Sequence, residues 1–502
     1  MSADPNASKV LEDAFFVREE EWEQARSEGY EFIIIGSSFC ALGFATELLQ
    51  RSPDAKILLL ERGGFLLPDH VQNLHPIFKS ILRGTCETFP WQFQQSPGVE
   101  LLRGILPFFG GKSLVWSGWC PKPCLESTTS WPLSFTQGLR EFLEAAEDLL
   151  QVVSSSEVYK GELQAVLKNL LDDNIHDKKV MFAPLAMGGA LCKKFCTAAP
   201  LLSLAKSHKN FKIATNCLVY EIVNNNGTAT ALKTSRGEVK LYDTNKLVLC
   251  MGAIPSTALV LNSFPTFHHI GKTVVCQFIS SLVARVPRED YKLSPPQHLE
   301  LSALYIEGQK YHIQVTGMDN PDPGKNKATA TRLAPDLVAN PTEEQMQSSK
   351  EGFVILVCIG IGEFGENTES GVERTNGDHL NCDNIKIHVK ESKADQAVKT
   401  RMEDAMQDVL RALSPQGRID FWDSSCNKWK KTLPGDVRSS IIINESSTMP
   451  IEQSVDINYQ LKGTNNVFLT GNAILPIQCG SWNPTLTIVA LARHLGAQLA
   501  NN

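Results

Sequence analysis

The stretch from Glu31 to Glu61, EFIIIGSSFCALGFATELLQRSPDAKILLLE, decides the fold of the first part of the chain. Its two short apolar runs, 32–35 and 57–60, are typical of strands buried on both faces of a parallel sheet. Between them, Leu42, Ala45 and Leu49 recur at helical spacing. The sequence therefore predicts a unit of strand, tight turn, helix and second strand.

The turn from Gly36 to Ala41 occupies the positions of a G-x-G-x-x-G/A dinucleotide turn, with Ser38 where the middle glycine usually stands. Small residues are needed there because the backbone must pass close to a pyrophosphate, and the following helix points a partial positive charge at the phosphates. Glu61 follows the second strand, where a carboxylate can accept hydrogen bonds from an adenosine ribose and would repel a 2′-phosphate. These features favour a site for FAD or NAD over NADP. The alternative is an ordinary unit of this topology that binds no dinucleotide.

Length and composition limit the function classes. At 502 residues the chain suits two or three domains, and 42% hydrophobic with 21% charged residues is typical of a soluble globular protein. A net charge of -7 gives no reason to expect nucleic acid or anionic lipid as a partner. No apolar run approaches the ~20 residues of a membrane helix, and residues 1–30 lack the order of a signal peptide. We therefore expect a cytoplasmic protein with mostly reduced cysteines.

Two cysteine pairs, Cys120/Cys124 and Cys192/Cys196, have C-x3-C spacing and could be read as four zinc ligands. Nothing in the sequence forces the two loops together, so we expect no metal site.

The end of the chain repeats the pattern of its beginning. Apolar runs at 247–250 and 467–470 read as further buried strands, the first ending at Gly252-Ala253 and the second at Gly471. Asn483-Pro484 is a helix start signal, with Asn at the N-cap, for a mostly apolar helix over 485–499. The orphan N–H groups of such a buried helix need a partner, and a cofactor oxygen would serve.

The middle of the chain differs. From Phe278 to about residue 434, alternating strands such as 299–306, 311–315 and 353–361 predict a mostly antiparallel domain covered by a helix over 396–413. Residues 320–349 are polar and Pro-bearing, which predicts a long loop.

Several separated motifs together resemble those of the glucose-methanol-choline (GMC) oxidoreductases, with the closest likeness to the pyranose oxidase branch. They are 36–64, the Gly-Gly-Lys-Ser-Leu-Val-Trp stretch 110–116, Trp131-Pro132, Gly252-Ala253, and the C-terminal pieces 471–474 and 483–487. The last piece, Asn-Pro-Thr-Leu-Thr, is the most specific.

The resemblance implies a Rossmann-like FAD-binding α/β domain plus a mostly antiparallel β-sheet substrate domain covered by helices, of the p-hydroxybenzoate hydroxylase-like type. Residues 30–130, 190–277 and 435–502 would form a discontinuous FAD-binding domain, and 131–189 and 278–434 the substrate-binding domain. Residues 1–29 would be an N-terminal extension.

The resemblance also assigns site residues. It implies cofactor-binding roles for Gly36, Ser38, Ala41, Glu61, Arg62, Gly110, Gly111, Ser113, Val219, Gly252, Ala253, Gly471, Asn472, Pro484 and Thr485. The helix after Asn483 would point its positive end at the flavin pyrimidine, which favours taking up a hydride.

Two positions depart from the family pattern. Pyranose oxidases carry a flavin-linked histidine at the position of Val115, so we expect FAD to be bound without a covalent bond. The usual catalytic histidine is replaced by Asn444. An asparagine can orient a hydroxyl but cannot accept its proton, and Glu445 is the nearest candidate base. Trp482 could wall the substrate or pack in the core.

We therefore expect an FAD-dependent oxidoreductase that oxidises a CH–OH or activated C–H group of a small, sugar-like or specialised metabolite by hydride transfer, with Asn444, Asn483 and Glu445 as catalytic residues. The sequence does not decide whether the electron acceptor is oxygen or a quinone-like molecule. Because the histidine is missing, the alternative is net non-redox chemistry on the same fold, by a lyase, isomerase or cyclase.

Overall fold

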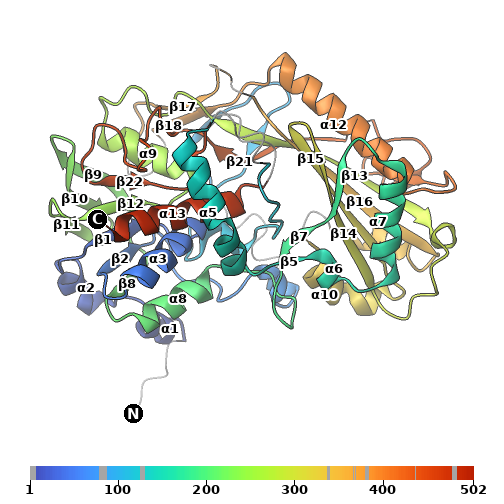
Figure 1. The fold of residues 1–502 in the computed structure, drawn as a ribbon, viewed down its shortest axis with the longest axis horizontal. Coiled ribbons are helices and arrows are strands. Elements are labelled where there is room, and N and C mark those ends of the chain that lie inside the picture. The colour runs from blue at the N-terminus through green and yellow to red at the C-terminus, as the bar shows by residue number, and fades with distance from the viewer. Residues whose placement is uncertain are drawn as a thin grey trace, which may run out of the picture.

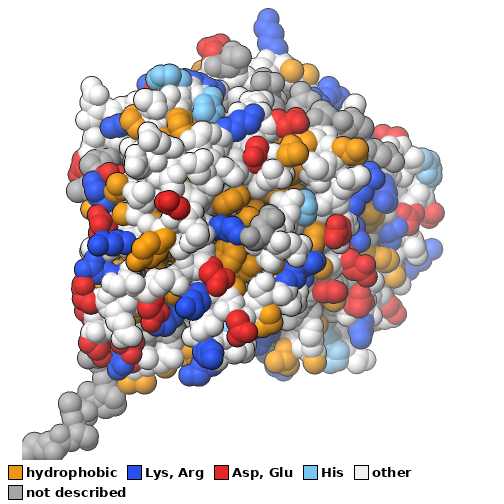
Figure 2. Space-filling model, turned by 60° about the vertical axis from the view of Figure 1, so that its left-hand side comes forward, with side chains coloured by type: hydrophobic (Ala, Val, Ile, Leu, Met, Phe, Trp, Pro, Cys, Tyr) orange, Lys and Arg blue, Asp and Glu red, His pale blue; other side chains and the backbone are white. Residues whose placement is uncertain are grey.

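The computed structural model describes residues 7–78, 88–124, 131–335, 340–365, 367, 369–378, 384–435, 437–476 and 483–501. Figure 1 shows two sheets side by side, a small one among helices and a large one with α7 and α12 against its outer face. None of the helices in these ranges is long and apolar enough to cross a membrane. Acidic and basic side chains are interspersed on the face drawn in Figure 2.

The smaller of these two sheets is parallel and has the strand order β22-β12-β1-β2-β8. Every residue of β1 and β2 is buried, as the uninterrupted apolar runs predict. The strands are β1 (Phe32–Ile35), β2 (Ile57–Leu60), β8 (Phe211–Ala214), β12 (Lys246–Leu249) and β22 (Val467–Leu469).

Two helices from opposite ends of the chain, α3 (Phe39–Arg51) and α13 (Thr485–Ala500), cross closely beside this sheet (Figure 1). A Cβ atom at Gly496 would lie 2.7 Å from the carbonyl oxygen of Phe44, so only glycine permits this approach. The other side of α13 packs against α5 (Leu133–Leu150). The last helix is thus held in the core by its own small and aliphatic residues.

The larger sheet has nine strands and is almost wholly antiparallel; its central order is β19-β13-β16-β15-β14-β6. β21 pairs with β13, and only the short β4 pairs in parallel, with β21. Its outer face is covered by α12 (Lys393–Ala412) and α7 (Glu162–Asn174). The strands are β4 (Leu101–Leu102), β6 (Lys179–Phe182), β13 (Val275–Pro287), β14 (Glu300–Gly308), β15 (Tyr311–Asp319), β16 (Phe353–Glu363), β19 (Asp420–Asp423), β20 (Lys428–Lys430) and β21 (Arg438–Ser446).

The fold class expected from the sequence is therefore confirmed, with a parallel α/β part and a mostly antiparallel sheet covered by helices. The limits of the two domains stay a prediction.

Shorter elements complete the described chain. The strands are β3 (Gln92–Gln94), β5 (Val152–Ser154), β7 (Pro184–Ala186), β9 (Val219–Asn225), β10 (Thr228–Thr234), β11 (Gly237–Lys240), β17 (Gly371–Arg374) and β18 (Ile385–His388). The α-helices are α1 (Ala7–Phe15), α2 (Glu19–Ala25), α6 (Ser155–Val158), α8 (Ala198–Ser207) and α9 (Ala253–Ser263). The 3-10 helices are η1 (Val71–Asn73), η2 (Gly111–Leu114), η4 (Arg288–Tyr291) and η5 (Asn472–Ile474).

Two local expectations were wrong. The stretch 320–349 contains two helices, α10 (Pro323–Leu333) and α11 (Glu343–Gln347), where the sequence suggested one long loop. Both begin at side-chain caps: Asp322 accepts a bond from the Lys325 N–H, and Thr342 forms a capping box with Gln345. The last helix starts at Thr485, as expected, but its N-cap is Pro484 and not Asn483.

Candidate functional site

A cavity of about 1020 Å³ extends from the carboxyl edge of the parallel sheet to the inner face of the large sheet. Turns that follow four parallel strands contribute Gly36, Glu61, Gly252 and Gly471 to its wall. The carboxyl edge of a parallel sheet is where such folds bind ligands, because the chain leaves each strand there through a loop.

Gly36 and Gly471 stand at positions of this edge where the backbone conformation and the close neighbours leave no room for a side chain. Gly36 has φ +96°, and a Cβ atom there would lie 2.9 Å from the Cys250 carbonyl oxygen. Gly471 has φ +99°, and its Cβ would lie 3.0 Å from Cys40 Sγ. Ser38, the N-cap of α3, makes no side-chain capping bond, so the first N–H groups of α3 stay available to a ligand anion.

Glu61 is buried and held in place from two sides. Its Oε2 accepts a hydrogen bond from Ser37 Oγ at 2.6 Å, and its Oε1 accepts one from the Gly63 N–H at 3.0 Å. Burial raises the pKa of the Glu61 carboxyl, while the bonds from Ser37 and Gly63 act in the opposite direction. Ser37 Oγ also accepts from the Gly110 N–H at 2.9 Å, so it ties the carboxylate to the glycine loop. Sequence reasoning missed Ser37, because only its neighbours belong to the motif.

The glycine loop forms η2 and is fixed from behind. Ser113 Oγ donates to the Gly110 carbonyl at 2.7 Å and lies 2.8 Å from Thr197 Oγ1. Gly111 lines the cavity, whereas Gly110, Ser113 and Ala41 are buried and do not. We infer that these three support the cavity wall from behind. The other predicted cofactor residues line the cavity: Gly36, Ser38, Glu61, Arg62, Gly111, Val219, Gly252, Ala253, Gly471, Asn472, Pro484 and Thr485.

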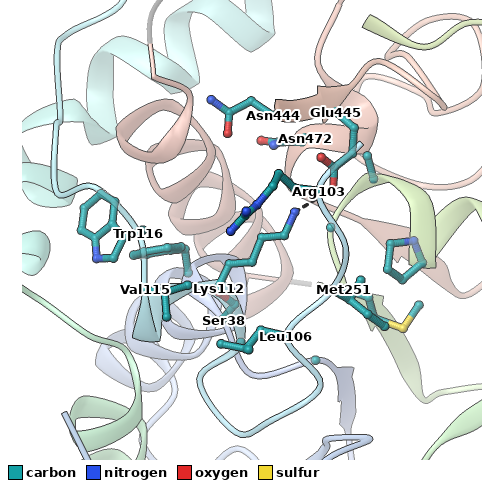
Figure 3. Close-up of a pocket in the computed structure, with 18 of the residues that line it drawn as sticks. Ser38, Arg103, Leu106, Lys112, Val115, Trp116, Met251, Asn444, Glu445 and Asn472 are labelled. Carbon is teal, nitrogen blue, oxygen red and sulfur yellow. Dashed lines mark hydrogen bonds and ion pairs between the residues drawn. The ribbon is translucent and has the colours of Figure 1, made fainter. Parts of the chain in front are cut away.

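Asn444, Glu445 and Asn483, the three expected catalytic residues, line the same cavity. Figure 3 shows Asn444 and Glu445 facing the side chains of Arg103 and Lys112. Asn444 and Glu445 are consecutive in β21, and a regular strand would point them to opposite faces. The pairing of β21 with β13 shifts between Ser446↔Val275 and Ile443↔Gln277, so Asn444 and Glu445 together oppose a single residue. This β-bulge allows both side chains to reach the cavity.

Asn444 is set by its backbone and by one partner. Its φ is +54°, a left-handed conformation that Asn tolerates better than most residues, and its Nδ2 donates to Gln277 Oε1 at 2.7 Å. Nearby in the wall, the Oδ1 atom of Asn472 is buried without a partner in the described residues. Such an atom needs a donor from a ligand or from water.

Glu445 is 7% exposed and bonded on one side only. Its Oε1 accepts from Lys112 Nζ at 3.1 Å, while its Oε2 is buried with no hydrogen-bond partner among the described residues (Figure 3). Lys112 keeps 43% of its side-chain surface exposed and lines the cavity. Neither Lys112 nor Arg103 was given a role from the sequence: Lys112 lies within the stretch 110–116 but the resemblance assigned it no function, and no motif marks Arg103.

Histidines do not supply a base in the described part of the site, since none of them lines the cavity. Two described histidines contact the wall from behind: His312 Nε2 lies 3.1 Å from Gln314 Nε2, and His70 Nε2 donates to the Trp116 carbonyl at 2.9 Å while its Nδ1 accepts from the Gln72 N–H. Burial, helped by nearby Lys194, lowers the pKa of His70 to about 3. His494 is hydrogen-bonded to Tyr459 Oη at 2.9 Å and packs on Phe142, so it belongs to the core.

The cysteines of the wall are poor nucleophiles. Burial raises the pKa of Cys40 to about 12 and raises those of Cys217 and Cys250 as well, so the thiols stay protonated at neutral pH. Among the described residues there is no group of three or more His, Cys, Asp or Glu that could hold a metal ion. Val115 lines the cavity with an aliphatic side chain, and Trp482 lies outside the described residues.

Comparison with known proteins gives a fold and no family. No protein-family model matches the chain, and no curated protein matches it in sequence. The crystal structure of pyridoxine 4-oxidase from Mesorbium loti is similar, with a TM-score of 0.65 and 15% sequence identity over 94% of this chain and 100% of that chain. At this identity the likeness establishes that the two chains share a fold over nearly their whole lengths.

Proposed function

We propose that the chain is an FAD-dependent oxidoreductase of GMC type, which oxidises a CH–OH or activated C–H group of a small organic molecule. The observation that carries this proposal is the cavity itself. At the sheet edge it is lined by the buried carboxylate of Glu61 and the turn at Gly36. Under the large sheet it is lined by the amides of Asn444 and Asn483 and the carboxylate of Glu445. All of the stretches that resemble GMC motifs except Trp131-Pro132 contribute residues to its wall, and the fold is shared with an oxidase.

FAD fits the residues present. The cavity of about 1020 Å³ is at the upper end of the ~300–1,000 Å³ common for small-ligand sites, which suits a long cofactor. Gly36 and Ser38 at the start of α3 would hold the pyrophosphate, and Glu61 the adenosine ribose. Asn472 Oδ1, buried and unpartnered, would accept a donor from the cofactor. Val115 has no nucleophilic atom, so the cofactor would be retained without a covalent bond.

Bound there, FAD would supply the acceptor for the hydride that leaves the substrate carbon. The side chains of this protein would hold and deprotonate the substrate. Asn444 and Asn483 would orient the reacting oxygen through hydrogen bonds, without a change of charge. The hydroxyl proton would pass to Oε2 of Glu445, the free oxygen of that carboxylate, while Lys112 holds the other oxygen.

The test is anaerobic mixing of the purified, yellow protein with candidate substrates, pyridoxine and simple alcohols among them, while flavin absorbance is followed. Bleaching by a substrate, reversed by air or by a quinone, is the expected result. Turnover of a substrate without bleaching would instead favour a lyase, isomerase or cyclase. A protein that retains no flavin after purification and reconstitution would overturn the proposal.

A further inference from the structure

The part of the cavity under the large sheet is roofed by aliphatic side chains. We define the aliphatic ceiling as Ile279, Val283, Ile359, Ile361 and Ile443. Four of them come from the adjacent strands β13 and β16 and one from β21.

Strand register brings these residues together. Ile279 lies directly opposite Ile361, and Val283 directly opposite Val357, in the antiparallel pair of β13 and β16. Residues two apart in a strand share a face, so Ile359 and Ile361 point the same way. With Val357, Ile279 and Val283 they form a hydrophobic cluster separate from the main cores. Because Ile279 and Val283 are only partly buried, the cluster lacks a covering layer on its cavity side.

Polar side chains at the rim of the ceiling are largely bound to other protein groups. Gln314 Nε2 lies 3.1 Å from His312 Nε2, and Asn340 Nδ2 donates to Thr331 Oγ1 at 3.1 Å. Thr342 and Gln345 bond each other reciprocally in the capping box of α11.

The five side chains of the aliphatic ceiling carry no hydrogen-bonding atom, and the rim atoms named above already have protein partners. A sugar would place several hydroxyls against this surface, and each would lose its water without gaining a partner. A hydrocarbon gains from the same burial.

We infer that the substrate is an alcohol with a mainly hydrocarbon body, alkyl or alicyclic, rather than a sugar. Its hydroxyl is held by Asn444, Asn483 and Glu445, and its body lies against the aliphatic ceiling. This inference rests on the proposed oxidoreductase function and narrows its substrate class.

The test compares probes on the flavin-loaded protein. Straight-chain primary alcohols from butanol to decanol, cyclohexylmethanol and D-glucose are titrated anaerobically, and both flavin reduction and binding-induced shifts of the flavin spectrum are recorded. Each added methylene is expected to tighten alcohol binding about fourfold until the ceiling is covered, and glucose to bind weakest. Tighter binding of glucose than of every alcohol, or no dependence on chain length, would overturn the inference.

These two readouts separate the inference from the function. Alcohols that bind with the expected chain-length dependence but leave the flavin oxidised would support the substrate class and count against hydride transfer. Reduction of the flavin by glucose and by none of the alcohols would support hydride transfer and count against the hydrocarbon substrate class.

A matched pair of variants tests the ceiling itself. Val283→Thr and Val357→Thr make the same nearly isosteric change at directly opposed positions, but only Val283 lines the cavity. We expect Val283→Thr to weaken octanol binding about tenfold and Val357→Thr to leave it unchanged. Equal effects of the two substitutions on octanol binding would contradict the proposed contact, whatever happens to thermal stability.

Discussion

Lys112 Nζ donates to Glu445 Oε1 at 3.1 Å, a contact between residues 333 positions apart in the chain. It joins the glycine loop of the parallel-sheet part to the bulge in β21. The remaining oxygen of Glu445, Oε2, is buried in the cavity wall without a hydrogen-bond partner among the described residues.

If Glu445 accepts the substrate proton, Glu445→Gln should lower turnover by roughly 10²–10⁴-fold, because a glutamine amide cannot take a proton. Lys112→Met should lower it less, and the double variant should be no worse than Glu445→Gln, since the two residues act as a unit. Stopped-flow flavin reduction is the measurement. Glu147→Gln, which breaks the peripheral pair with Lys122, is the matched control and should leave the rate unchanged. Full activity in Glu445→Gln would remove it from the mechanism.

Glu61→Ala should weaken FAD retention far more than the surface substitution Lys179→Ala. The ribose would lose its bonds to the carboxylate. Ser37 Oγ, which accepts from the Gly110 N–H of the glycine loop, would lose the carboxylate that holds it in place. The flavin content of each variant after gel filtration, read as the ratio of visible to ultraviolet absorbance, gives the answer. Equal flavin content in both variants would contradict the ribose assignment.

The flavin should be released by acid precipitation, because Val115 offers no atom for a covalent link. The measurement is the absorbance of the supernatant and the colour of the washed pellet. A pellet that stays yellow would show that a covalent bond forms somewhere else in the site.

Asn483→Ala should lower turnover by roughly the 10²–10³-fold that follows loss of one positioned hydrogen-bond donor, while FAD stays bound. Adding Asn444→Ala should lower it further. Asn174→Ala, on the exposed end of α7, is the control. Normal kcat in the double variant would sink this placement of the reacting oxygen.

Acid should destabilise the protein in part through His70. Burial lowers the folded-state pKa of His70 to about 3, so between the ordinary pKa and that value only the unfolded chain takes up the proton. The contribution of neutral His70 to the free energy of unfolding is therefore complete above the unfolded-state pKa of ~6.5. It is lost as the pH falls, and the loss reaches about 2 kcal/mol at pH 5. Urea unfolding at pH 7 and pH 5 should show a correspondingly smaller loss in His70→Gln than in the unchanged protein. The same loss in both would mean that His70 is protonated in the folded state.

Local sequence signals were sufficient where an element depends on its own residues. The run from Glu31 to Glu61 determined β1, α3 and β2, because uninterrupted apolar strands and a small-residue turn have few other folded solutions. The last helix followed from its apolar composition and the Asn-Pro start. The signals for α10 and α11 were also present, as Asp322-Pro323 and Thr342 with Gln345, but the polar composition of 320–349 concealed them.

Tertiary structure alone decided the chemistry of the cavity. The ceiling exists because the register of β13 on β16 places Ile279 opposite Ile361, and a shift of one residue would turn these side chains to the other face. The bulge in β21 allows Asn444 and Glu445 to share the cavity, and chain folding over more than 300 residues brings Lys112 to the carboxylate. Such contacts have no local signature, since they depend on strand pairing between distant segments. The sequence determined which side chains were available and that no histidine stands at position 444, and the fold determined which of them meet.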